Sequence, residues 1–160
     1  MIYLFFLLFI VICKGALPSH ISNTQISGKN DIVSIKHASI LSFTPLLRLH
    51  DIVVVHDDGD MLTIDYTPIN QSHPDILLKL LTGKYVTAEV RIRKMSAWNL
   101  TEWYSLPSIT VSDITDIILR NKIIRVIDSW NHKDMDRGLL KMNLYKRNCK
   151  HFSNFVIKNF

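Results

Sequence analysis

The chain has 160 residues, of which 48% are apolar and 21% charged, a composition that predicts one folded domain with a hydrophobic core and excludes a disordered chain. Two cysteines are too few for a disulfide-stapled mini-domain or a four-cysteine zinc module, and five glycines and five prolines exclude a collagen-like sequence. The net charge of +5 is spread along the chain and no glycine-rich phosphate loop occurs, so neither nucleic acid nor a nucleotide cofactor is expected as a partner.

An unbroken apolar segment occupies residues 2–13. In a helix it rises about 18 Å, which is too short for a hydrocarbon core of about 30 Å and is typical of a signal peptide. Small residues follow at Gly15 and Ala16, so residues 1–16 are predicted to be a signal peptide that directs the protein outside the cell or into the endomembrane lumen. An uncleaved anchor of residues 2–13 is the alternative. Glycosylation sequons at Asn70 and Asn99 agree with the secretory route.

A β-hairpin is the first element with a strong signal. Residues 17–30 are polar and predict a leader, and residues 31–47 have short apolar stretches without a clear period. Residues 50–56 are β-branched and apolar, residues 57–60 are typical of a turn, and residues 61–66 form a second apolar run. This pattern predicts two antiparallel strands joined by a tight turn.

Six further segments follow the hairpin. The apolar pattern predicts a helix over 74–81 that Gly83 ends, a strand over 85–92, a loop over 95–109, a helix over 112–128, a strand over 138–145 and a helix over 149–160. In the helix over 112–128, one side is expected to carry Ile114, Ile117, Ile118, Ile124 and Ile127. Trp98, Trp103 and Tyr104 lie in the predicted loop, where they either pack or line a pocket or a lipid-facing surface. Residues 31–160 are therefore predicted to form one α+β domain, with an antiparallel sheet packed against helices.

Cys149 is the first candidate for chemistry because it begins the last predicted helix, with Asn148 before it as a cap. The positive end of the helix dipole and the free backbone N–H groups favour a thiolate there and can hold an oxyanion. Phe152 follows three residues later, so the sulfur is expected on the face that docks on the sheet. Removal of a signal peptide takes Cys13 away and leaves Cys149 as a lone thiol. A buried, inert cysteine is the alternative.

A nucleophilic cysteine needs a base, and the base needs an orienting group. His50 opens a strand in the centre of the predicted sheet, whereas His151 is two residues from Cys149 and points away from it on a helix. Counted from the hairpin turn, His50 lies opposite residue 67, which makes Asp65 its diagonal neighbour. Asp65 lies in an apolar strand, where an unpaired carboxylate is costly, so it is expected to have a partner. An outward-facing aspartate is the alternative.

Residues 148–152, Asn-Cys-Lys-His-Phe, resemble the Asn-Cys-x-His-Phe motif of the lecithin retinol acyltransferase family. That family belongs to the circularly permuted papain-like superfamily, together with the NlpC-type cell-wall peptidases. There a strand histidine comes first, a second polar residue follows on the next strand, and the cysteine comes last at a helix start. His50, Asp65 and Cys149 occur in this order, although the second residue in the acyltransferase family is usually histidine.

This resemblance implies a permuted papain-like fold with the nucleophile Cys149 at the start of the C-terminal helix, His50 as the general base and Asp65 as its orienting group. It predicts a thiol-dependent hydrolase or acyltransferase that acts on an amide or ester bond of a lipid or peptide, with contact to a membrane surface as a further expectation. A non-catalytic secreted binding domain with a structural Cys149 is the alternative. No metal is expected, because the acidic turn at residues 57–60 lacks the rest of a calcium loop and no His-Glu-x-x-His motif occurs.

Overall fold

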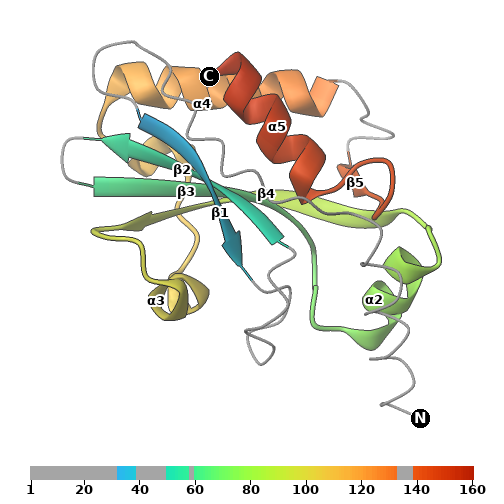
Figure 1. Cartoon of the computed structure of the whole chain (residues 1–160). Helices are drawn as coiled ribbons and strands as arrows, with labels where there is room; N and C mark the ends of the chain where they lie inside the picture. Colours follow the sequence, from blue (N-terminus) through green and yellow to red (C-terminus); the bar gives the residue numbers. More distant parts are fainter. Residues whose placement is uncertain (1–31, 39–49, 58–59, 133–138) are drawn as a thin grey trace.

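Five antiparallel strands form one sheet in the computed structural model, which describes residues 32–38, 50–57, 60–132 and 139–160. Their spatial order equals their chain order: β1 (Ile32–Ala38), β2 (His50–Asp57), β3 (Asp60–Pro68), β4 (Val86–Met95) and β5 (Lys141–Met142). Figure 1 shows helices on both sides of this sheet. The predicted α+β class with an antiparallel sheet packed against helices is confirmed, while the predicted signal peptide and leader lie outside the described residues.

The predicted hairpin of β2 and β3 is confirmed, and so is its register. Ile52 lies opposite Asp65 and Val55 lies opposite Leu62, which places His50 level with Thr67, as the count from the turn predicted. The strand β1 was not predicted, because Ser34, Lys36 and His37 interrupt its apolar residues. Among the described strands it lies at the edge of the sheet and pairs with β2, so one buried face is enough to stabilise it.

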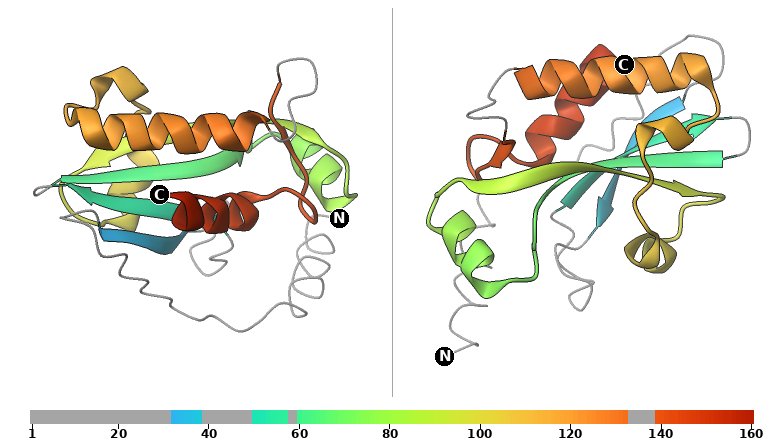
Figure 2. Two further views of the ribbon diagram at one scale, coloured as in Figure 1. Left: turned by 90° about the horizontal axis from the view of Figure 1, so that it is seen from above. Right: turned by 180° about the vertical axis from the view of Figure 1, so that it is seen from behind.

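One face of the sheet is covered by α4 (Ile117–His132) and α5 (Cys149–Asn159), which lie on the same side of the strands in Figure 1 and in the right view of Figure 2. The main core lies between these two helices and the sheet. Its largest fully buried side chains include Tyr66, Ile64, Phe152 and Ile123. Phe152 and Val156 of α5 are buried and Phe155 packs beside them, which is the pattern of an amphipathic helix. α5 therefore packs on the sheet with the face that carries Phe152 and Val156, and Cys149 at the start of the helix packs against the same core.

The opposite face carries α3 (Leu100–Ser105) and a smaller cluster of Ala38, Ile52, Met95 and Trp103. The prediction of a continuous loop over 95–109 is therefore wrong at α3. This short helix begins at Asn99, whose side chain accepts hydrogen bonds from the backbone N–H groups of Thr101 and Glu102. Burial of Trp103 then fixes the helix against the sheet. Trp98 and Tyr104 are partly buried against the same cluster, so these aromatic residues pack.

The helix predicted over 112–128 begins later, and a different side of it is buried. Thr110 and Asp113 close a capping box around the single turn η1 (Val111–Asp113), and Asp116 then caps α4 by accepting from the N–H groups of Ile118 and Leu119. This start rotates the helix relative to the predicted one. The buried side carries Leu119, Ile123, Val126 and Trp130, whereas Ile117 and Ile118 are 61% and 71% exposed.

The remaining elements lie at the end of the sheet where β5 pairs with β4. The predicted helix over 74–81 is confirmed as α2 (Pro74–Leu81), and Gly83 follows it with a positive φ of 72°, a conformation that glycine adopts without strain. The strand predicted over 138–145 is limited to the two residues of β5, because the chain turns at Asn143. None of the helices in the described part of the chain has the length and apolar character needed to cross a membrane.

Candidate active site

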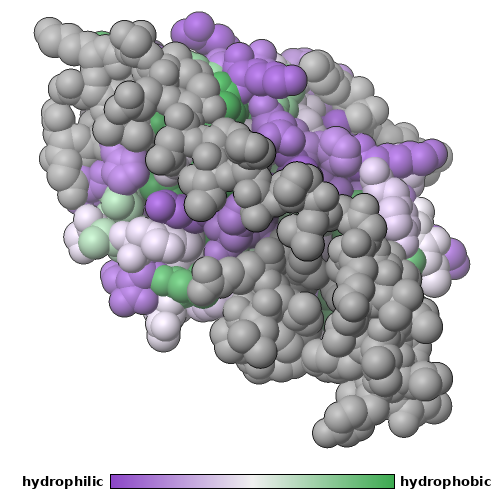
Figure 3. All heavy atoms as spheres, in the orientation of Figure 1, coloured by the Kyte–Doolittle hydropathy of each residue, from purple (hydrophilic) through white to green (hydrophobic). Residues whose placement is uncertain are grey.

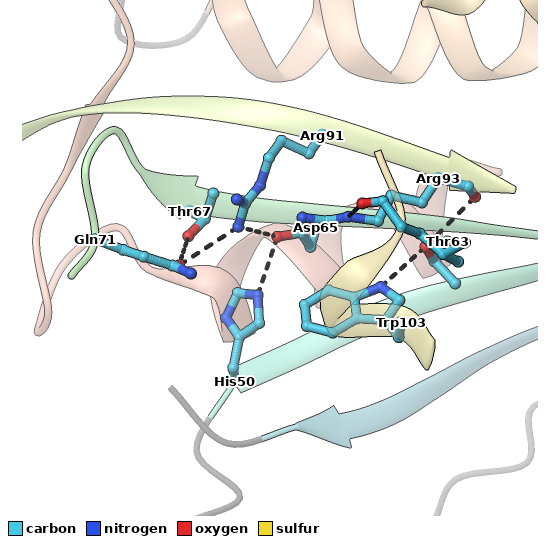
Figure 4. Close-up of polar contacts among 9 residues, drawn as sticks. His50, Thr63, Asp65, Thr67, Gln71, Arg91, Arg93 and Trp103 are labelled. Carbon is cyan, nitrogen blue, oxygen red and sulfur yellow. Dashed lines mark hydrogen bonds and ion pairs between the residues drawn. The ribbon is translucent and has the colours of Figure 1, made fainter. Parts of the chain in front are cut away.

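His50 is the first residue of β2 and is 8% exposed. Its ring nitrogen Nε2 lies 3.2 Å from Oδ2 of Asp65 on the neighbouring strand, as Figure 4 shows. The same ring is hydrogen-bonded to the side chain of Cys149. The structure thus brings together the three residues that sequence reasoning selected, across 99 positions of the chain.

Asp65 is fully buried and accepts from three cationic side chains. Arg93 Nη1 lies 2.6 Å from Oδ1, and Arg91 Nη2 lies 3.1 Å from Oδ2, the oxygen that also faces His50. Arg91 is directly opposite Asp65 in the pairing of β3 with β4, and residues two apart on a strand share a face. The alternative of an outward-facing aspartate is therefore wrong. Asp65 has three partners where one was expected: His50, Arg91 and Arg93.

Cys149 is partly buried at the first position of α5 and packs against the main core. Asn148 precedes it as the predicted cap and accepts from the N–H of His151 at 3.1 Å, while the Nδ1 atom of His151 accepts from the N–H of Asn148. His151 is exposed and contacts Asn148 at the start of the helix, and its exclusion as the base stays a prediction. The site is thus held at the sheet–helix boundary by a complete helix cap.

The turn before Cys149 is anchored to the rest of the fold. Asn143 Nδ2 donates to the carbonyl of Gly83 at 2.6 Å, and Asn143 Oδ1 accepts from the N–H groups of Tyr145 and Lys146. Arg147 donates to the carbonyl of Trp130 at 2.9 Å and its guanidinium lies 4.1 Å from the centre of the indole ring. Figure 3 shows hydrophilic residues over this turn and α5, and Tyr145 of the turn is exposed.

The charges at the site are strongly coupled. Burial disfavours a charged imidazole, but the hydrogen bonds to Asp65 and Cys149 and the negative charges of both raise the pKa of His50 from 6.5 to about 10. Burial also disfavours a charged carboxylate, but the hydrogen bond to His50 and the positive charges of His50, Arg91 and Arg93 lower the pKa of Asp65 below 3.8. At neutral pH the pair is therefore an imidazolium and a carboxylate.

These shifts predict how stability depends on pH. A raised pKa of His50 adds stability that is fully present below pH 6.5 and is lost as the pH rises towards 10, while the lowered pKa of Asp65 adds stability that is present above pH 3.8 and is lost below it. In urea titrations of the wild type, we expect the free energy of unfolding to decline as the pH rises from 6.5 towards 10. His50→Gln, which removes the imidazole and keeps Asp65 and Cys149, should lack this decline, and an equal decline in both would contradict the assignment.

Arg91 and Arg93 are the site residues that sequence reasoning did not select. Arg93 is 6% exposed, donates through Nε to the carbonyl of Leu106 at 3.2 Å and stacks over Trp103 at 4.5 Å. Trp103 in turn donates to Thr63, which donates to the carbonyl of Arg93. The signal was present as two arginines two positions apart, Arg91 in the predicted strand over 85–92 and Arg93 just beyond it, together with an aspartate that required a partner.

The described ranges contain no group of three or more His, Cys, Asp or Glu side chains that could hold a metal ion. Both sequon asparagines, Asn70 and Asn99, are exposed, and their glycosylation stays a prediction. Comparison with known proteins gives no match to a family model, to a curated protein or to a solved structure. The resemblance of residues 148–152 to the acyltransferase motif therefore stays a prediction.

Proposed function

We propose that the protein is a thiol-dependent hydrolase or acyltransferase that acts on an amide or ester bond of a lipid or peptide. The observation that carries the proposal is the buried ring of His50, which is hydrogen-bonded to Asp65 on one side and to Cys149 on the other. A base held between a nucleophile and an orienting group is the arrangement that covalent catalysis requires. The motif at residues 148–152 and the order of the three residues along the chain support a permuted papain-like fold.

In the proposed reaction the resting site holds a thiolate of Cys149 beside the imidazolium of His50. The sulfur attacks the carbonyl carbon, and backbone N–H groups of the first turn of α5 stabilise the oxyanion. His50 gives its proton to the leaving nitrogen or oxygen, the bond to the leaving group breaks, and a thioester remains on Cys149. Water or a second acceptor then loses a proton to His50 and attacks the thioester, which releases the acyl group and restores the ion pair.

Trapping of the thioester tests this function directly. We expect p-nitrophenyl acetate to add one acetyl group to the full chain, seen by intact-protein mass spectrometry, and neutral hydroxylamine to remove it because thioesters are cleaved under those conditions. Cys149→Ser should lose the labile acetyl group, whereas Cys13→Ser, which removes the other thiol of the sequence, should keep it. Equal acetylation of the two variants would reject Cys149 as the nucleophile.

A binding domain with a structural cysteine is the second candidate, and one observation favours it. Cys149 packs against the main core as a small apolar side chain would. If no acyl group accumulates on Cys149 and the thiol is inert, this alternative is supported. Secretion directed by residues 1–16 and contact with a membrane surface are compatible with both candidate functions. N-terminal sequencing of exported protein tests the secretion.

A further inference from the structure

The two arginines of β4 contact Asp65 in different ways. Arg93 Nη1 bonds to Oδ1, which faces no other cation among the described side chains. Arg91 Nη2 bonds at 3.1 Å to Oδ2, which also accepts from His50 Nε2 at 3.2 Å, and Figure 4 shows both groups converging on that oxygen. Arg91 therefore shares an acceptor atom with the imidazolium, and Arg93 does not.

Arg91 is held in this position by contacts of its own. Its Nη2 also lies 3.4 Å from Oε1 of Gln71, and that oxygen accepts from the hydroxyl of Thr67 at 2.6 Å. The side chain of Arg91 is only 18% exposed, so water screens its charge weakly. A chain of contacts thus runs from Thr67 through Gln71 and Arg91 to the carboxylate that faces His50.

The charged groups around His50 come from three elements. Asp65 on β3 and Cys149 on α5 favour a protonated ring, and both are in hydrogen-bond contact with it. Arg91 and Arg93 on β4 have the same charge as the imidazolium and oppose protonation, while Glu89 on the same strand acts on Arg93. Trp103 of α3 is neutral, with its ring 6.1 Å from that of His50. Of the two arginines, only Arg91 also competes for the oxygen that His50 uses.

We propose that Arg91 is a positioning residue of the thiol site, which acts through Asp65: by sharing Oδ2 it limits how strongly the carboxylate holds the imidazolium, and so keeps His50 able to release its proton. This inference rests on the proposed function, because proton release from His50 to the leaving group is the step that forms the thioester. A carboxylate bonded to His50 alone would hold that proton more strongly. Arg93 then fixes the carboxylate in place, and Arg91 adjusts its interaction with the base.

Titration of His50 by nuclear magnetic resonance tests the inference without any turnover. In the full chain with Cys149→Ser, which removes the thiolate that also raises the proton affinity of His50, we expect Arg91→Gln to raise the titration midpoint of the His50 ring by about one pH unit. Arg91→Lys keeps the charge and should restore a midpoint near that of the parent. Lys94→Gln is the matched control, since it removes one positive charge from the same strand where Lys94 pairs with Asp60 at the surface.

Gln71→Ala is a second test that leaves the charges at the site unchanged. It keeps both arginines and removes only the contact of Arg91 with the side chain of Gln71. We expect a smaller shift in the same direction, with far-UV circular dichroism to verify that each variant is folded. An unchanged midpoint in Arg91→Gln and Gln71→Ala, or an equal shift in Lys94→Gln, would overturn the inference. The titration is done in Cys149→Ser and does not depend on acyl transfer. A failure of acyl trapping would therefore reject the proposed function, whereas the titration midpoints test the role of Arg91 independently.

Discussion

Asp65→Ala should lower the free energy of unfolding by about 3–5 kcal/mol, the range measured when one partner of a buried ion pair is removed. The carboxylate is fully buried and is the acceptor for His50, Arg91 and Arg93. Without it, the guanidinium of Arg93 stays in the sheet interior with its Nη1 donor and its charge uncompensated. Urea titrations near neutral pH measure the loss, and the m-value shows whether unfolding stays two-state.

Asp60→Ala is the matched control for this prediction. Asp60 begins the same strand and pairs with Lys94 at 2.6 Å, but both side chains are nearly half exposed. Water and salt screen such a pair, so its loss should cost less than about 1 kcal/mol. If the two alanine variants lose equal stability, the cluster of cations around Asp65 does not depend on its carboxylate, and the electrostatic description of the site is wrong.

His50→Ala should slow the alkylation of Cys149 by iodoacetamide at pH 6 by about 10- to 100-fold. The thiolate is the reacting form, and a cysteine without assistance is less than about 1% thiolate at this pH. Under the proposed function His50 is the base that takes up the proton of the thiol, and its ring is hydrogen-bonded to Cys149. Peptide mass spectrometry after timed quenching measures the labelling of Cys149 separately from that of Cys13.

His56→Ala provides the comparison, because it removes a histidine from the same strand about one strand length from His50. Its alkylation rate should stay within about twofold of the wild type, since no contact joins this residue to the site among the described hydrogen bonds. Equal rates for the His50 and His56 variants would remove His50 from the role of base. That result would also favour the structural reading of Cys149.

The sequence predicts best those parts of the fold where a local pattern is compatible with only one arrangement of the backbone. The hairpin of β2 and β3 follows from two β-branched runs around an acidic turn, and its register follows from counting. The face of α4 was predicted wrongly because isoleucines occur on several sides of it, so periodicity does not select the buried side. The cap at Asp116 selects it, by fixing where the first turn begins.

The same distinction applies to the site. Cys149, His50 and Asp65 could be found because each has a local reason: a helix start, a strand start and a carboxylate in an apolar strand. The role of Arg91 and Arg93 could not be predicted in this way. Alternation along a strand predicts that they share a face, but it does not predict which residue of the neighbouring strand they contact. The pairing of Asp65 with Arg91 depends on the register between β3 and β4, which are separated by α2 and its turns.

Gly83 shows how the position of Cys149 depends on a distant segment of the chain. Its carbonyl holds the side chain of Asn143, and a β-carbon added to it would lie 3.4 Å from the ring of Tyr145. Its positive φ already disfavours other residues. Selection for a correctly placed Cys149 therefore reaches back more than sixty positions, to the end of α2, where sequence drift is expected to be slow.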